Sequence, residues 1–155
     1  MVMDYFKTFS DYLKEDLSLN DSDIEIRIEI KNNPYASDGY PNIVSTYASV
    51  DGKDVGRYMF YKYDRKKEEG KGTKDWKYIH PQYNEFLYIG DAYVSPNFRR
   101  KGLATKIVEY TSKETQLPII DVGKNRSGYG DMFWKKMGDR PNVEKKANNY
   151  ILYPK

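Results

Sequence analysis

The chain of 155 residues is long enough for one domain with a single hydrophobic core. Its 26 basic and 23 acidic residues nearly cancel, so the net charge of +3 argues against binding to nucleic acid. The absence of cysteine excludes a disulfide framework, a thiolate zinc site and a cysteine nucleophile. The sequence also lacks a long apolar stretch, so we expect a cytoplasmic protein with no membrane span, folded as one domain over residues 1–155.

The first part of the chain carries one helical pattern and one strand pattern. Apolar residues recur at helical spacing in residues 4–17, which predicts an amphipathic helix. In residues 24–31 four isoleucines alternate with charged residues, which predicts a strand with one buried and one wet face. Residues 32–42 contain two prolines and a glycine and are expected to form a loop.

A hairpin and a long loop are predicted next. Residues 43–50 and 54–63 are rich in β-branched and aromatic residues, which is typical of strands. The Asp51-Gly52 pair between them favours a two-residue turn with positive φ at both positions. Residues 64–83 begin with a dense run of charges and predict a long loop, a kind of segment that often carries function.

The second half of the chain predicts a β-α-β unit followed by further elements. Strands are expected over residues 85–94 and 117–122, with a helix over residues 100–115 between them. Such a unit pairs its strands in parallel, whereas the hairpin is antiparallel. A helix over residues 128–137 and one or two strands over residues 143–153 complete the pattern. We therefore predict an α/β (α+β) fold with a mixed, mostly antiparallel twisted sheet and flanking helices.

The turn between the predicted strand and helix carries the chemistry. Arg99, Arg100 and Lys101 add positive charge where the first amides of a helix lack internal partners. Gly102 leaves the backbone open to close approach. These features favour a phosphate or pyrophosphate site. The alternative is a solvated helix start that happens to be basic.

This turn resembles the signature of the Gcn5-related N-acetyltransferases (GNAT). Arg99-x-x-Gly102-x-Ala104 is similar to the family's R/Q-x-x-G-x-G/A sequence, and Val94-x-Pro96 before it is similar to the family's flank. The basic turn and the resemblance therefore point to the same kind of ligand.

Two further segments resemble the same family. Residues 48–56 are similar to its D-G-x-x-V-G hairpin, and Asn125 followed by residues 133–138 is similar to its N…Y-E-K-x-G-F segment. The three matches fall in the family's order and cover residues 43–139. The resemblance implies a central pair of parallel strands that splay apart.

The resemblance also implies acetyl-CoA as co-substrate and direct acetyl transfer to an amine of a protein or a small molecule. The backbone of the strand over residues 85–94 would pair with the pantetheine arm, and the amides of residues 100–105 would hold the pyrophosphate. The cofactor contacts implied are Tyr93, Val94, Arg99, Arg100, Lys101, Gly102, Leu103, Ala104, Thr105, Asn125 and Trp134.

Three residues are candidates for catalysis. A carboxylate that accepts the proton of the amine is expected at Asp121, with Asp91 as the second choice. The structural alternative for Asp121 is an ion pair with Lys124. Trp134 stands where the family has a tyrosine, and an indole cannot deliver a proton at neutral pH. Tyr129 is a nearby phenol, although an exposed loop tyrosine is the plainer interpretation.

Three functions remain open from the sequence. The first is an active N-acetyltransferase. The second is a non-catalytic GNAT-fold binding module that keeps the fold and coenzyme A binding, which the missing tyrosine favours. The third is a small nucleic-acid-binding protein, which the balanced charge disfavours. Residues 32–42 are too short for the helices that wall the family's acceptor site, so we expect an open site suited to a protein acceptor. The C-terminal strand could pair with a second copy in a homodimer.

Overall fold

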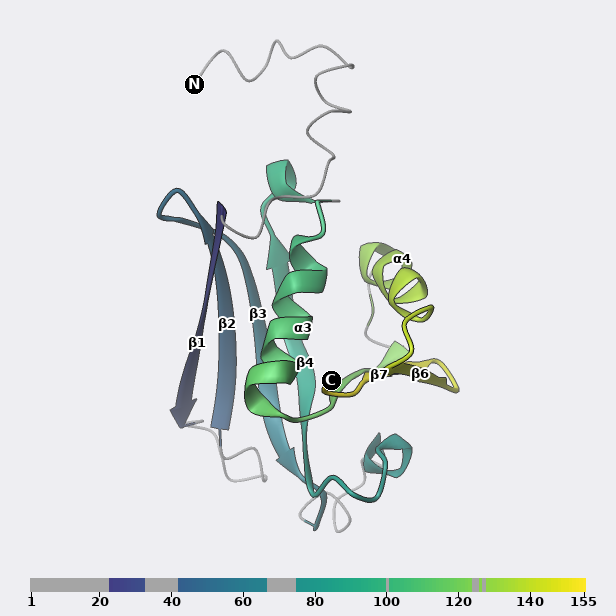
Figure 1. Cartoon of the computed structure of the whole chain (residues 1–155). Coiled ribbons are helices and arrows are strands. Elements are labelled where there is room, and N and C mark those ends of the chain that lie inside the picture. The colour runs from purple at the N-terminus through teal and green to yellow at the C-terminus, as the bar shows by residue number, and fades with distance from the viewer. Residues whose placement is uncertain (1–22, 33–41, 67–74, 100, 124–125, 127) are drawn as a thin grey trace.

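The computed structural model describes most of the chain, and the predicted helix over residues 4–17 lies outside the described residues. The described residues are 23–32, 42–66, 75–99, 101–123, 126 and 128–155. They form one mixed sheet with the strand order β1-β2-β3-β4-β5-β7-β6 (Figure 1). The strands are β1 (Ile24–Asn32), β2 (Asn42–Val50), β3 (Lys53–Asp64), β4 (Glu85–Val94), β5 (Ile119–Asp121), β6 (Val143–Lys146) and β7 (Asn149–Leu152). Every neighbouring pair is antiparallel except β4 and β5.

Helices α3 (Leu103–Thr115) and α4 (Gly128–Met137) contribute to the same core cluster and stand apart along the sheet (Figure 1). Two 3-10 turns, η4 (Asp75–Tyr78) and η5 (Pro96–Phe98), precede and follow β4. The predicted mixed sheet, parallel strand pair and flanking helices are confirmed, and the C-terminal tail forms two strands. Of the helices in the described ranges, none has the length and apolar character needed to cross a membrane.

The main core lies between α3 and one face of the sheet. Alternation along β2 and β3 directs Val44 and Phe60 toward α3, whose Leu103 and Ile107 are fully buried. Burial of each such side chain contributes roughly 1.5–3 kcal/mol. Gly56 on β3 lets the helix approach, because a Cβ there would lie only 3.0 Å from Ile107 Cδ1. This packing fixes the start of α3 over β3.

The opposite face of the sheet carries a second cluster rich in tyrosine. Phe86, Ile120 and Ile151 are its buried centre. The partly buried tyrosines packed against it are Tyr61, Tyr78, Tyr83, Tyr88 and Tyr153. Tyrosine suits this face because its ring packs against the apolar cluster while its hydroxyl stays in contact with water. This face therefore accounts for part of the high tyrosine content.

One arginine ties the segment before β4 to the end of β3. The Arg65 guanidinium donates to the carbonyls of Ile79 at 2.7 Å, His80 at 3.0 Å and Tyr83 at 2.9 Å. It also lies 5.9 Å from the centre of the Trp76 ring. The described end of the predicted long loop is therefore anchored against the tyrosine-rich face.

The parallel strands β4 and β5 pair over two positions and then part. Leu87 pairs with Ile119 and Tyr88 with Ile120. Further along β4 the pairing with β3 shifts between Ile89 and Asp91, and Gly90 is the extra residue of a β-bulge. A Cβ on Gly90 would lie 2.5 Å from the Tyr61 ring, so a side chain there would require that ring to move. Beyond the bulge, residues 91–94 pair with β3 and have no partner on β5.

Replacing Gly123 with Ala should destabilise the junction after β5. A Cβ at Gly123 would lie 2.5 Å from the backbone oxygen of Asn148, so one of the two segments must move. We expect a loss of about 1–3 kcal/mol in the free energy of unfolding, measured by urea denaturation. The control is Gly128→Ala, where a Cβ meets no atom within 4 Å and alanine is the better helix former. Equal stability of the two variants would contradict this packing argument.

Candidate functional site

Hydrogen bonds hold the turn that leads from β4 into α3. The amide of Ser95 donates to the carbonyl of Val55 at 2.8 Å, which joins the turn to β3. The amide of Phe98 donates to the carbonyl of Ser95 at 2.8 Å and closes η5. Arg99 Nε donates to the carbonyl of Val94 at 3.0 Å, so its charged head stays beside the end of β4. The turn is therefore fixed on both sides.

The helix begins at Leu103 rather than at residue 100, because Gly102 adopts a φ of 81° as its N-cap. Gly102 has no side chain to cap the first amides, and a Cβ built there meets no atom within 4 Å. Lys101 Nζ lies 5.5 Å from the centre of the Phe98 ring and adds charge to this open end. Arg100 lies outside the described residues. The arrangement suits an anionic group with several oxygens, such as a phosphate.

The unpaired end of β4 lies next to this turn. Because successive residues of a strand alternate, Asp91 and Tyr93 face away from α3 while Ala92 faces toward it. The Tyr93 side chain is 53% exposed. Asp91 Oδ2 accepts from Arg57 Nη2 at 2.9 Å, and both side chains are about half exposed. The open strand edge and the open helix end thus adjoin each other.

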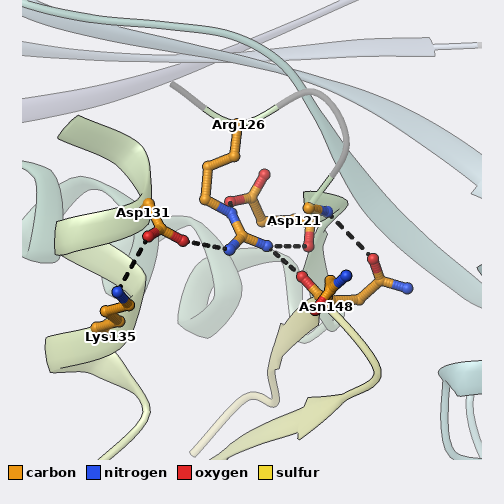
Figure 2. Close-up of polar contacts among 7 residues, drawn as sticks. Asp121, Arg126, Asp131, Lys135 and Asn148 are labelled. Carbon is orange, nitrogen blue, oxygen red and sulfur yellow. Dashed lines mark hydrogen bonds and ion pairs between the residues drawn. The ribbon is translucent and has the colours of Figure 1, made fainter. Parts of the chain in front are cut away.

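Figure 2 shows an ion-pair network at the end of β5. Arg126 Nε donates to Asp121 Oδ2 at 2.8 Å, and Arg126 Nη1 donates to Asp131 Oδ1 at 3.1 Å. Arg126 Nη2 donates to the carbonyl of Asn148 at 2.6 Å. Lys135 joins from the next turn of α4, with Nζ 3.3 Å from Asp131 Oδ2. The network connects β5, α4 and the β6–β7 turn.

Asp121 is therefore an ion-paired residue, and its partner is Arg126. The side chains are 13% and 6% exposed, respectively. Burial raises the pKa of the Asp121 carboxyl, and the Arg126 charge offsets part of that rise. The sequence interpretation considered an ion pair with Lys124, which lies outside the described residues.

The three remaining predicted site residues near α4 have different outcomes. Trp134 is 2% exposed and stacks on Tyr150, with ring centres 5.8 Å apart. It belongs to the core because α4 turns this position toward the sheet, and its expected contact with the cofactor stays a prediction. Asn125 and the side chain of Tyr129 lie outside the described part of the structure.

The comparison with protein families identifies the family of the chain. The model described as "Acetyltransferase (GNAT) family" matches residues 6–116. The chain belongs to the GNAT acetyltransferase family. A comparison with curated proteins finds no match.

Solved GNAT structures resemble the chain at low identity. The N-acetyltransferase YlbP of Bacillus subtilis, solved in complex with coenzyme A, is 16% identical. The alignment covers 84% of this chain and 97% of YlbP, with a TM-score of 0.54. A GNAT family acetyltransferase of Elizabethkingia anophelis, solved with acetyl-CoA bound, is also 16% identical over 86% of this chain and 97% of that one, with a TM-score of 0.45. At these identities the likeness to YlbP shows the GNAT fold alone.

Two described residues near this region were not singled out by the sequence analysis. Arg126 contacts Asp121 and Asp131, each five residues away, and the Asn148 carbonyl, and no sequence pattern indicated that it would be the partner of Asp121. Tyr58 is 7% exposed on the α3 side of β3. Strand alternation between Gly56 and Phe60 could have placed it inward.

A separate groove of about 510 Å³ follows the outer side of α3. It is lined by Ile24 of β1, by Lys106 and Lys113 of α3, and by C-terminal residues including Lys155. None of the described residues expected to contact the cofactor lines it. The groove is therefore distinct from the turn that begins α3 in this GNAT fold.

Proposed function

We propose that this chain is an acetyl-CoA-dependent N-acetyltransferase that transfers an acetyl group directly to an amine. The observation that carries the proposal is the meeting of two open features, the helix start at Gly102 and the unpaired edge of residues 91–94. A pyrophosphate fits the first and a chain of amides fits the second. Membership of the GNAT family makes acetyl transfer the expected chemistry.

Among the described residues, backbone amides and basic side chains would bind different parts of acetyl-CoA. The amides of Leu103, Ala104 and Thr105 at the start of α3 would hold the phosphates, with Arg99 and Lys101 beside them. The backbone groups of β4 around Tyr93 and Val94 that face away from β3 would pair with the pantetheine amides. Of these groups, the Val94 carbonyl already accepts from Arg99 Nε at 3.0 Å. When bound, acetyl-CoA supplies an activated acyl thioester, so the protein needs to provide orientation and charge stabilisation.

We assign the role of proton acceptor to Asp91 in preference to Asp121. Both carboxylates pair with an arginine, Asp121 with Arg126 at 2.8 Å and Asp91 with Arg57 at 2.9 Å. The Asp121 pair is buried, whereas the Asp91 pair is about half exposed on the face of the sheet away from α3, where an amine can reach it. An amine approaching from that face would meet the Asp91 carboxylate directly or through one water. Tyr129 remains a proposed contributor from the start of α4.

A binding module that retains coenzyme A without catalysis is the second candidate. The specific observation in its favour is Trp134, which fills the family's tyrosine position and is buried in the core. No proton donor is thus available from that side chain.

Calorimetric titration with acetyl-CoA, followed by an assay of thiol release with amines, tests the two candidates together. The amine panel should contain peptides with free N-termini, lysine peptides and polyamines. Binding with thiol release supports the enzyme. Binding without release for every amine supports the module, and no binding by a folded sample free of coenzyme A would overturn both.

A further inference from the structure

Tyr58 occupies an unusual position beneath the point where β4 and β5 part. It pairs with Ala92 of β4, and residues directly opposite in an antiparallel pair point to the same face. That face is the one covered by α3, and Tyr58 belongs to the core cluster that contains Trp134. Ala92 is small and exposed, so it leaves space between the ring of Tyr58 and the unpaired edge of β4.

No hydrogen bond joins the Tyr58 hydroxyl to another residue in the part of the chain that the structure describes, and only 7% of the residue is exposed. A buried phenol of this kind is suited to donate its hydroxyl hydrogen to a bound ligand.

The electrostatic surroundings of Tyr58 come from β5 and α4. Burial and, to a smaller extent, the negative charge of Asp121 together raise the pKa of Tyr58 to about 12. Asp121 is in turn paired with Arg126, which also contacts Asp131. The α3 side chains of the same cluster, Leu103 and Ile107, are apolar. Tyr58 on β3 and Asp121 on β5 thus approach the same space from either side of β4.

We propose that the Tyr58 hydroxyl donates a hydrogen bond to the sulfur of coenzyme A, in the role that Trp134 cannot fill. The inference rests on the proposed function, because it needs acetyl-CoA to lie between β4 and β5. The hydroxyl donor would thus come from Tyr58 on β3, and not from the α4 position that Trp134 occupies.

The proton balance follows from the acidity of the phenol. The amine nitrogen forms a bond to the acetyl carbon as the carbon–sulfur bond breaks, and the electron pair of that bond goes to sulfur. An ordinary thiol has a pKa of about 8.5, well below that of Tyr58, so the phenol keeps its proton and stabilises the sulfur as a hydrogen-bond donor. The amine loses its proton to Asp91 or water, and the thiolate takes one from water.

Calorimetry with coenzyme A and with desulfo-coenzyme A, which lacks the sulfur, isolates this hydrogen bond. Wild type and Tyr58→Phe are compared at about pH 9, where the thiol is largely ionised. The preference for coenzyme A over desulfo-coenzyme A is expected to fall at least about tenfold in Tyr58→Phe, as for a hydrogen bond to a charged group. Desulfo-coenzyme A should bind both proteins alike, which also shows that the variant is folded.

The matched control is Tyr83→Phe, which removes a phenol from the tyrosine-rich face on the other side of the sheet. It should keep the wild-type preference. An unchanged preference in Tyr58→Phe would overturn the role of Tyr58 and leave the cofactor site standing. Failure of the wild type to bind either ligand would overturn the proposed function and this inference with it.

Discussion

Replacing Gly102 with Glu is expected to abolish measurable binding of acetyl-CoA. The new carboxylate would stand at the open end of α3, where the phosphates are proposed to lie. Two like charges about 4 Å apart repel by about 4 kcal/mol near a protein surface, which corresponds to roughly a thousandfold loss of affinity. Isothermal titration calorimetry of the folded variant measures the loss directly.

The control for this experiment is Gly52→Glu in the β2–β3 turn. Gly52 has a φ of 77° and Gly102 a φ of 81°, and neither has an atom within 4 Å of a built Cβ. Both variants therefore carry the same added charge and a similar backbone strain of roughly 1–2 kcal/mol. Affinity close to wild type in Gly52→Glu locates the effect at the start of α3. Unchanged binding in Gly102→Glu would contradict the phosphate site.

Replacing Arg126 with Gln is expected to lower the free energy of unfolding by about 3–5 kcal/mol near neutral pH, because it leaves the Asp121 carboxylate buried without its partner. Chemical denaturation of both proteins gives the difference. The comparison variant is Arg57→Gln, whose pair with Asp91 is about half exposed and should contribute less than about 1 kcal/mol.

The loss in Arg126→Gln should depend on pH with a defined sign. Burial already raises the folded-state pKa of Asp121 above 3.8, and removing the Arg126 charge raises it further. A raised folded-state pKa means that the folded chain binds the proton more tightly than the unfolded chain does. The penalty is therefore full above the raised pKa and shrinks as the pH falls toward 3.8.

Two results would contradict the explanation that Arg126 stabilises the fold through its ion pair with Asp121. If Asp121→Asn combined with Arg126→Gln is as unstable as the sum of the single variants, the two residues do not interact and the ion-pair argument fails. A loss in Arg126→Gln that stays constant with pH would also contradict it.

The regular parts of the fold were predictable because their signals are local. The alternation in residues 24–31 gave β1, and the Asp51-Gly52 pair has positive φ at both positions, as its turn type requires. The signature turn was placed correctly between β4 and α3, although the helix starts at Leu103. Each of these features depends on neighbours only a few residues away.

The ion pairs of Asp121 and the burial of Trp134 could not be predicted, because they depend on how the elements pack against each other. The partner of Asp121 is Arg126, and that pair is stabilised by Asp131 and by the Asn148 carbonyl, which is 22 residues away from Arg126. The burial of Trp134 likewise depends on the side of α4 that meets the sheet. Asp121 and Asp131 are each five residues from Arg126, but tertiary packing decides which charged neighbour pairs with Asp121.

The bulge in β4 also limits how this chain can diverge. Because a Cβ on Gly90 would meet the Tyr61 ring at 2.5 Å, a side chain at position 90 requires that ring to move or residue 61 to become smaller. A substitution at position 61 that precedes the one at position 90 avoids this displacement, so that order of changes is favoured. Relatives that carry a side chain at position 90 should accordingly have a small residue at 61, and the shape of the strand edge would be inherited together with that tyrosine.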